Sequence, residues 1–325
     1  MHERYNSAVE WLENKSLKLI STQKIYKGIN SNVWKIEGKD FCYALKLYKI
    51  DNKNNNRYNR EVSFISHLNK YKLNCVPKLI EKDKLNNWVL YDWIKGDKIK
   101  SIDQNSIHKI INFIVDLKGI AKETRPEYIP NASDYCLSGN DFKKNIDTRL
   151  NLMEKRSKEN INVKEFYDQV IVKDINDYRE NFQKELLSKS INDFISRCGK
   201  TLSQSDMGIH NIIKKPDGMF CFIDFEHSGW DSVIKTIADL ILQPENILNR
   251  ELSQILINES CHYFNLDNYK SDNWKIILET QRIKWALIML NPILKNKSHI
   301  KSEYYEELKR NVKNYLKKTK ETIYK

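Results

Sequence analysis

The 325-residue chain lacks any hydrophobic run long enough to cross a membrane. Its most apolar window, Trp285–Leu294, is too short to span a bilayer and contains Asn291 and Pro292, so we interpret it as a buried helix. The first fifteen residues include acidic side chains and no apolar stretch, which argues against a signal peptide. The sequence therefore predicts a protein with no transmembrane segment.

Cysteine pairing motifs are also missing. The six cysteines are scattered along the chain, and none forms a Cys-x-x-Cys pair. This pattern argues against a structural zinc site and against a disulfide framework, and it predicts reduced thiols in a cytoplasmic protein. The cysteines are Cys42, Cys75, Cys136, Cys198, Cys221 and Cys261.

The composition is that of a soluble globular protein, with 40% apolar and 30% charged residues. A chain of this length can form one large or two moderate domains. The net charge of +12 favours anionic partners such as nucleotides, acidic metabolites, nucleic acid or an anionic membrane surface. Heavy use of lysine throughout offers a compositional explanation for the same charge, so both interpretations stay open.

The order of predicted elements divides the chain into two parts. Thr22–Tyr48 alternates as antiparallel strands do, Arg57–Tyr71 has a helical apolar stripe, and Trp88–Ile94 is a further strand. Beyond Asp103 long amphipathic segments dominate, with helices expected at 140–159, 163–195, 232–243, 250–263, 273–291 and 301–319. We predict an α+β protein with a small β-rich lobe (1–93) and a larger, mostly helical lobe (94–325).

One hairpin gathers polar residues at a single end. Pro216-Asp217-Gly218 separates two short apolar runs, and this combination is typical of a turn. The predicted hairpin places Asn211 opposite Phe222, with Asp224 two residues further along and Asp206 leading into the same end. A carboxylate at the end of an apolar strand needs a partner, which marks this end as a candidate site.

Phosphoryl transfer from a nucleotide needs a cation for the phosphates, metal ligands, and a group that meets the acceptor hydroxyl. Asp206 and Asn211 have the Asp-x-x-x-x-Asn spacing of a kinase catalytic loop. Asp224 ends a strand and precedes Phe225, as in the metal-binding Asp-Phe-Gly motif. Tyr43-Ala44-Leu45-Lys46 is similar to the Val-Ala-Ile-Lys strand, and Glu61 on the next helix can pair with its lysine.

These motifs resemble the aminoglycoside phosphotransferase and choline kinase family, which has a two-lobed protein-kinase-like fold. The resemblance covers about residues 20–295. His210-Asn211, Ile223-Asp224-Phe225-Glu226, Gly229-Trp230-Asp231 and Ala238-Asp239 follow the family pattern. Gln204-Ser205-Asp206 departs from the usual His-Gly-Asp, which affects the geometry of the loop but not the presence of its Asp.

The resemblance implies roles for the catalytic and metal-binding residues. Asp206 would orient or deprotonate the acceptor hydroxyl, and Asn211 and Asp224 would bind Mg²⁺. Glu226 is a candidate substrate contact, with metal binding and a capping role as alternatives. Because the departures remove no metal ligand or base, the resemblance favours an active enzyme.

The resemblance also implies a nucleotide site in the first lobe. Lys46 would contact the α- and β-phosphates of ATP and would be held by Glu61. Ser31 and Asn32, in the stretch Gly28–Val33, would cover the phosphates, and Val89–Ile94 would line the adenine site. The stretch has one glycine where protein kinases have three, so this motif is weak by itself.

We expect a phosphotransferase that moves the γ-phosphoryl group of ATP to a hydroxyl of a sugar, amino sugar, aminoglycoside or amino alcohol. The basic charge favours an anionic acceptor. A protein kinase is the nearest rival, and Gln243-Pro244-Glu245 is similar to its Ala-Pro-Glu motif, but the segment before it reads as a helix instead of a long polar loop. The alternatives are a nucleotide-binding pseudokinase and a polyanion-binding protein that uses the basic run Lys309–Lys325; no nucleic-acid motif accompanies that run.

Overall fold

A computed structural model describes residues 2–28, 30–49, 52–246, 248–295 and 302–324 of the chain. The chain forms two compact units, each assembled from segments that are far apart in the sequence. Unit 1 comprises Met1–Lys100, Ile120–Ser133 and His210–Gly229, and unit 2 comprises Ser101–Gly119, Asp134–Ile209 and Trp230–Lys325. The predicted lobe boundary between residues 93 and 94 stays a prediction.

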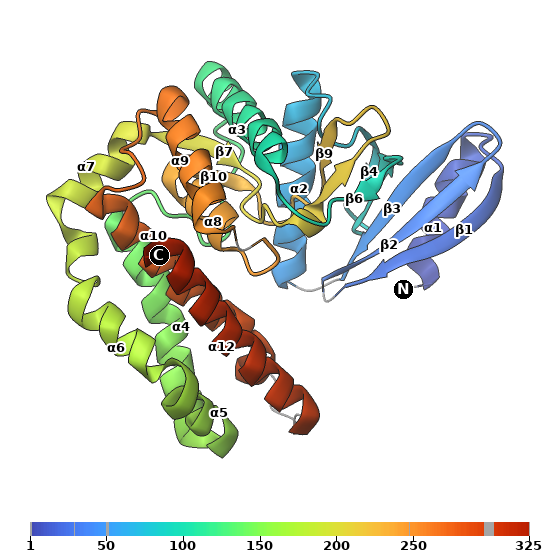
Figure 1. The fold of residues 1–325 in the computed structure, drawn as a ribbon. Helices are drawn as coiled ribbons and strands as arrows, with labels where there is room; N and C mark the ends of the chain where they lie inside the picture. The colour runs from blue at the N-terminus through green and yellow to red at the C-terminus, as the bar shows by residue number, and fades with distance from the viewer. Residues whose placement is uncertain (1, 29, 50–51, 247, 296–301, 325) are drawn as a thin grey trace. The chain divides into compact units, whose positions relative to one another are not determined.

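Unit 1 is built on a five-stranded antiparallel sheet with the strand order β1-β2-β3-β5-β4. Helices α1 (His2–Asn14) and α2 (Asn52–Lys70) pack against this sheet. Figure 1 shows β1, β2 and β3 side by side next to α1. The strands are β1 (Leu19–Lys27), β2 (Ser31–Gly38), β3 (Cys42–Tyr48), β4 (Leu79–Asp83) and β5 (Trp88–Asp92).

The alternation of side chains along β3 separates core residues from site residues. Leu45 and Leu47 are buried in a hydrophobic cluster that includes Ala8 and Leu12 of α1. Because successive side chains of a strand point to opposite faces of the sheet, Lys46 points away from this cluster. The strand therefore supplies core residues on one face and a buried lysine on the other.

A second, smaller sheet in unit 1 contains the predicted hairpin. β8 (Ile212–Lys214) pairs with β9 (Phe220–Phe222), and β6 (Asp97–Lys98) pairs with β8 on its other side. All pairs are antiparallel. The hairpin prediction is thus confirmed.

The register of the hairpin differs from the prediction by one residue. Phe222 lies opposite Ile212, so its predicted pairing with Asn211 is wrong. The cause is the turn, which has three residues because the N–H of Lys215 donates to the carbonyl of Met219 at 2.8 Å. Gly218, with φ of 81°, supplies the left-handed residue that such a turn requires.

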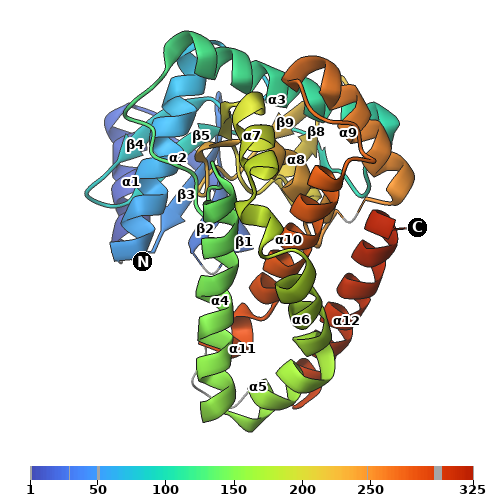
Figure 2. The same cartoon turned by 90° about the vertical axis from the view of Figure 1, so that its left-hand side faces the viewer.

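Unit 2 is mostly helical, and α10 (Asp272–Met289) is at its centre. This helix packs against α4, α8 and α12, and Figure 2 shows it between α4 and α12. The helices of the unit, in addition to α10, are α3 (Gln104–Thr124, whose last turn belongs to unit 1), α4 (Gly139–Glu159), α5 (Ile161–Phe166), α6 (Val172–Asn181), α7 (Lys189–Cys198), α8 (Val233–Leu242), α9 (Arg250–Phe264), α11 (Asn291–Lys295) and α12 (Ser302–Tyr324).

Polar caps define where several of these helices begin, among them α8, α9 and α10. The side chains of Ser232, Asn249 and Ser271 accept hydrogen bonds from backbone N–H groups in the first turns of α8, α9 and α10. Such caps satisfy donors that the helix itself leaves without partners. The start of α8 is therefore fixed by its own sequence, which matters for the loop that it contacts.

The predicted α+β class is confirmed, and most predicted helices are present. The segment 163–195 is less regular than predicted, because a π-helical turn (Tyr167–Ile171) separates α5 from α6, and α7 is a separate helix. A two-stranded sheet of β7 (Lys200–Ser203) and β10 (Gly229–Ser232) was not predicted. Among the described residues, no helix is both long and apolar enough to cross a membrane.

Candidate functional site

A buried ion pair between Lys46 and Glu61 occupies the centre of unit 1. The Nζ atom of Lys46 donates to Oε2 of Glu61 at 2.7 Å, and the two side chains are 7% and 3% exposed. The hydroxyl of Tyr48 donates to the same oxygen, and that of Tyr91 donates to Oε1 at 3.1 Å. The predicted pairing of Lys46 with Glu61 is present, and two tyrosines hold the carboxylate in place.

Lys46 makes a second contact at the end of the hairpin. Its Nζ atom lies 2.7 Å from Oδ1 of Asp224, whose side chain is 39% exposed. Burial lowers the pKa of Lys46, but the carboxylates of Asp224 and Glu61 outweigh this effect and raise its pKa above the ordinary value. Burial raises the pKa of Glu61, although Lys46 and Tyr48 favour the ionised carboxylate.

Asn211 lies at the same end of the hairpin as Asp224. Its side chain is buried, and its carbonyl accepts a hydrogen bond from the N–H of Ile223 at 2.9 Å. This bond joins the strand that starts after Asn211 to the residue just before Asp224. Asp224 itself has φ of 65°, a left-handed conformation that turns the chain as it leaves the hairpin.

Glu226 is buried and links the end of the hairpin to the β1–β2 turn. Its Oε1 atom accepts a hydrogen bond from Nδ2 of Asn30 at 2.8 Å and lies 3.3 Å from Nε2 of His227. Burial favours a higher pKa, but the bond from His227 and the charge of Lys46 outweigh it and hold the pKa of Glu226 at about 2. Glu226 is therefore an ionised carboxylate beside the Lys46 cluster.

The predicted phosphate-covering stretch is a tight turn between β1 and β2. The N–H of Gly28 donates to the carbonyl of Ser31 at 2.9 Å, and the side chains of Ser31 and Asn32 are buried. A Cβ atom on Gly28 would lie 2.9 Å from that carbonyl oxygen, so the turn needs a glycine there. Ile29 of this stretch lies outside the described residues.

Asp206 belongs to unit 2, where it follows β7. Its Oδ1 atom lies 3.5 Å from Nε2 of Gln243, the residue that ends α8. Ser205, directly before it, has φ of 69°, so the departure from the family's usual glycine occurs at a left-handed position. The structure thus connects the predicted base to α8.

No family model and no curated protein sequence matches the chain. Solved structures do match it along nearly its whole length. Choline kinase LicA from Streptococcus pneumoniae is 14% identical, covers 96% of this chain and 99% of its own, and gives a TM-score of 0.60. Spectinomycin phosphotransferase in complex with ADP and spectinomycin is 12% identical, covers 98% of both chains and gives a TM-score of 0.63. Ethanolamine kinase from Plasmodium vivax is 15% identical, covers 94% of this chain and 82% of its own, and gives a TM-score of 0.55.

The chain has the fold of these kinases. At such low identity the likeness establishes the fold alone, and it is the fold that the sequence resemblance implied. The roles of individual residues depend on the local geometry described above.

A cavity of about 890 Å³ lies elsewhere in unit 1. It runs along α2 and is lined by residues that include Arg60, Lys70, Lys82 and Lys84. Among the described residues that line it, none is a predicted site residue. The cluster around Lys46 is therefore distinct from this cavity and is defined by its hydrogen bonds and ion pairs.

Few of the described acidic side chains of unit 1 lie where a metal ion could be shared with a ligand. In the part of the chain that the structure describes, no group of three or more His, Cys, Asp and Glu side chains could hold a metal ion. Mg²⁺ is usually bound by one or two carboxylates together with phosphates and water. The half-exposed carboxylate of Asp224 beside Asn211 suits that arrangement, so the donor set fits Mg²⁺ shared with a nucleotide.

Sequence reasoning missed several residues that hold the site. The sequence indicates Tyr48 and Tyr91 only as strand residues, and Asn30 only as part of the turn. Their spacing carries a signal, because Tyr48 lies two residues after Lys46 on the same face of β3. Nothing in the local sequence of Asn30 indicates its bond to a residue almost 200 positions later.

Proposed function

We propose that the chain is an ATP-dependent phosphotransferase that moves the γ-phosphoryl group of ATP to a hydroxyl of a small molecule. The observation that carries the proposal is the position of Lys46, with its Nζ atom 2.7 Å from carboxylate oxygens of both Glu61 and Asp224. One partner is buried and the other is half-exposed. Lys46 is thus anchored by the buried carboxylate of Glu61, while its second partner, Asp224, is open to water and to a ligand. Such an arrangement lets polyphosphate reach the lysine by displacing Asp224, as the proposed reaction requires.

Each residue of the site has a role in this reaction. Lys46 binds the α- and β-phosphates, Glu61 holds Lys46, and the backbone at Ser31 and Asn32 covers the phosphates. Asn211 and Asp224 would hold Mg²⁺, which when bound neutralises charge on the transferring phosphoryl group.

The chemical step exchanges one O–P bond for another. The acceptor oxygen attacks the γ-phosphorus, the bond to the bridging oxygen of ADP breaks, and the hydroxyl proton passes to the carboxylate of Asp206. The protein contributes chiefly position and charge stabilisation.

A small acceptor is favoured over a protein. The segment after Glu226 continues as β10 and then α8, and it leaves no room in the sequence for a long activation loop before Gln243. Sugars, amino sugars, aminoglycosides and amino alcohols are the acceptor classes to screen. Anionic sugars belong in the same screen because the chain carries a net charge of +12.

Replacement of Asp206 tests the proposal. Asp206→Ala should lower kcat by roughly 10²–10⁴-fold, the usual contribution of a general base, while the affinity for Mg·ATP stays unchanged. Asp193→Ala, at an exposed position of α7, is the matched control and should keep wild-type kcat. Wild-type turnover in Asp206→Ala on an identified acceptor would refute the assignment.

A nucleotide-binding pseudokinase is the alternative, and it makes a different prediction. Both proposals expect Mg·ATP to stabilise the fold, by about 2.7 kcal/mol at a concentration of 100 Kd, and both expect EDTA to weaken this stabilisation. Only the enzyme consumes ATP when an acceptor is present. Thermal shift with Mg·ATP combined with an ATP-consumption screen over the four acceptor classes therefore separates them.

A further inference from the structure

The loop that carries Asp206 has an unfavourable backbone conformation. We call Ser203–Ile209 the Asp206 loop. Ser205 adopts φ of 69° within it, and a residue with a Cβ atom in the left-handed region costs roughly 1–2 kcal/mol. Glycine avoids this cost, but the chain has serine at this position, so other contacts must hold the loop.

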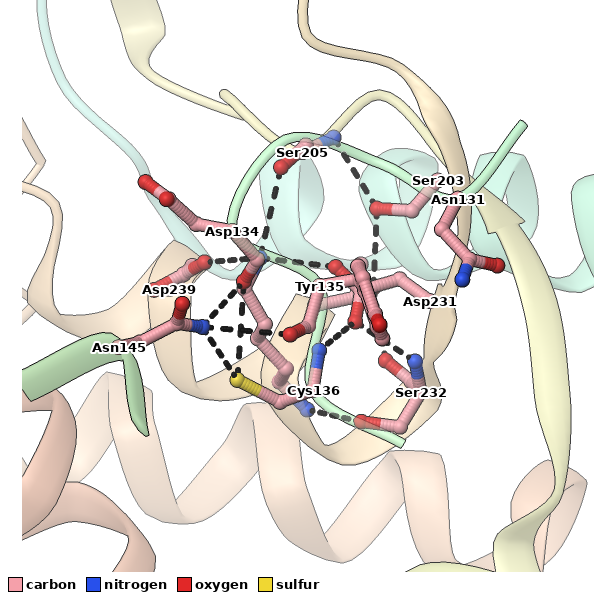
Figure 3. Close-up of polar contacts among 12 residues, drawn as sticks. Asn131, Asp134, Tyr135, Cys136, Asn145, Ser203, Ser205, Asp231, Ser232 and Asp239 are labelled. Atoms are coloured by element: carbon pink, nitrogen blue, oxygen red, sulfur yellow. Dashed lines mark hydrogen bonds and ion pairs between the residues drawn. The ribbon is translucent and has the colours of Figure 1, made fainter. Parts of the chain in front are cut away.

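The first half of the loop is held by the start of α8. The hydroxyl of Ser203 accepts hydrogen bonds from the N–H of Ser205 and from Oγ1 of Thr236, each at 3.0 Å. The Nζ atom of Lys235 donates to Oγ of Ser205 at 3.4 Å. Figure 3 shows Ser203 and Ser205 joined by these contacts. Two neighbouring residues of α8 thus bind the residues just before Asp206.

Lys235 is itself fixed within a buried ion cluster. Its side chain is 1% exposed and lies 2.8 Å from Asp231, four residues earlier in β10, and 2.9 Å from Asp239, one turn later in α8. Asp231 also accepts from the N–H of Cys136 at 2.9 Å (Figure 3). Asp239 accepts from Nε1 of Trp285 at 2.8 Å. A lysine with two buried ion-pair partners has little conformational freedom. Its ammonium group is therefore a rigid donor for the hydroxyl of Ser205.

The second half of the loop is held by residues that follow α8. The Oδ1 atom of Asn246 accepts from the N–H of Ile209 at 2.8 Å. Its Nδ2 atom donates to the carbonyl of Met207 at 3.1 Å and to that of Leu240 at 2.9 Å. One amide side chain therefore binds the backbone on the far side of Asp206 and ties it to α8.

Gln243 extends this second contact region to the carboxylate itself. Its Nε2 atom donates to Oδ1 of Asp206 at 3.5 Å, and its Oε1 atom accepts from the N–H of Glu245 at 2.6 Å. The side chain is buried, and the bond to Glu245 orients it. Both ends of α8 thus contact the Asp206 loop through side chains.

From these contacts we infer that Lys235 and Asn246 are positioning residues that hold the Asp206 loop from the two ends of α8. The inference rests on the proposed function, because that function makes the position of Asp206 important. A glycine at position 205 would adopt the left-handed conformation without strain. With serine there, the hydrogen bonds from Lys235 to Ser205 and from Thr236 to Ser203 stabilise that conformation instead. Asn246 fixes the backbone at Met207 and Ile209, so the carboxylate of Asp206 has one orientation toward an acceptor.

Hydrogen–deuterium exchange of peptides within 200–212 tests the inference without any acceptor. Ser205→Ala keeps the Cβ atom at φ of 69° but removes the hydroxyl that Lys235 binds, and Asn246→Ala removes both backbone contacts. Exchange in this segment should accelerate about tenfold in each variant, as expected for the loss of a hydrogen bond of ordinary strength. Ser205→Gly should exchange more slowly than Ser205→Ala, since glycine adopts the left-handed conformation without strain.

Kinetics provide the second measurement. Asn246→Ala should lower kcat by up to about 10²-fold with little change in KM for ATP, because small displacements of a catalytic group have effects of that size. Ser205→Ala should lower kcat, and Ser205→Gly should recover most of it. Asn249→Ala is the matched control, since the side chain of Asn249 caps α9 by accepting from the N–H of Leu252 and, among the described residues, has no hydrogen bond to the Asp206 loop. It should lower stability by about 1 kcal/mol and leave kcat and loop exchange unchanged.

The outcomes separate this inference from the proposed function. Unchanged exchange at 200–212 in both Ser205→Ala and Asn246→Ala overturns the inference, whatever the activity. If exchange accelerates as expected but the wild-type protein transfers no phosphoryl group from Mg·ATP, the loop contacts stand and the proposed function fails. Wild-type kcat in Asn246→Ala, in an enzyme with an identified acceptor, overturns the inference and leaves the function in place.

Discussion

Each unit of this chain contains a buried lysine between two carboxylates. In unit 1 Lys46 lies 2.7 Å from both Glu61 and Asp224. In unit 2 Lys235 lies 2.8 Å from Asp231 and 2.9 Å from Asp239. Asp239 also pairs with a second buried lysine, Lys284. Both Lys46 and Lys235 nevertheless lie at ion-pair distance from two carboxylates, so these distances alone do not distinguish a ligand site from a structural one.

The exposure of the carboxylates does distinguish them. The side chain of Asp224 is 39% exposed, whereas those of Asp231 and Asp239 are 0% and 3% exposed. Asp224 can therefore exchange its bond to Lys46 for water or a ligand at small cost. Asp231 and Asp239 cannot, because an unpaired buried charge is strongly unfavourable. We call Lys46, Glu61 and Asp224 the open cluster and Lys235, Asp231 and Asp239 the closed cluster. A cluster with one exposed carboxylate is suited to binding a ligand, and a fully buried cluster is suited to stabilising the fold.

Removal of the two lysines should have the largest effects and should differ between the clusters. Lys235→Met leaves two buried carboxylates with one less cation and should lower the free energy of unfolding by about 3–5 kcal/mol. Lys46→Met should cost less, because Asp224 can be hydrated and the two tyrosines still donate to Glu61. Urea unfolding followed by circular dichroism measures both values.

Two further results bear on this comparison. Lys317→Met, at an exposed position of α12, should stay within about 0.5 kcal/mol of wild type. If Lys46→Met and Lys235→Met lowered the free energy of unfolding equally, the exposure of the carboxylates would not distinguish the two clusters. Lys46→Met should also abolish stabilisation by Mg·ATP, whereas the exposed control keeps it.

Glu226, next to the open cluster, should make the free energy of unfolding depend on pH in the acid range. The pKa of this carboxyl is held at about 2 in the folded chain, below its ordinary value of 4.5. A lowered pKa contributes stability that is present above pH 4.5 and is lost as the pH falls toward 2, by about 3 kcal/mol at most. Glu226→Gln should remove this part of the pH dependence, so the two unfolding curves should converge as the pH falls. If the free energies of unfolding of wild type and Glu226→Gln changed in parallel between pH 4.5 and 2, the lowered pKa of Glu226 would be contradicted.

Most of the open cluster follows from the sequence, whereas most of the closed cluster does not. Lys46, Asn211 and Asp224 lie in motifs whose spacing the chemistry constrains, and the strand alternation of β3 and the hairpin turn position them. The predicted register of that hairpin differs from the observed one by one residue, because adjacent Pro, Asp and Gly suit a three-residue turn as well as a two-residue turn. Local propensities predict elements better than they predict such details.

The contacts of unit 2 depend on tertiary structure. Lys235 lies four residues from both Asp231 and Asp239, but only Asp239 shares its helix. Helical spacing therefore predicts the ion pair with Asp239, but not the contacts with Asp231 and Ser205. Asn246 sits in an irregular segment after α8, where no periodic pattern indicates that it binds Met207 and Ile209. The strands β7 and β10 have only four residues each and carry too little pattern to predict.

The smallest expected effect concerns the tyrosines that close the buried side of the open cluster. Tyr91→Phe removes the bond from its hydroxyl to Oε1 of Glu61, and we expect a loss of about 1 kcal/mol in the free energy of unfolding and a modest rise in KM for ATP. Tyr58→Phe is the matched control in the same unit, since Tyr58 is also buried and its hydroxyl has no hydrogen-bond partner among the described residues. It should be neutral or slightly stabilising in urea unfolding.

If Tyr91→Phe were as neutral as Tyr58→Phe, Lys46 and Tyr48 would be sufficient to hold Glu61. The anchored side of the cluster would then be less rigid than its burial suggests, and the contrast with the closed cluster would depend on Asp224 alone.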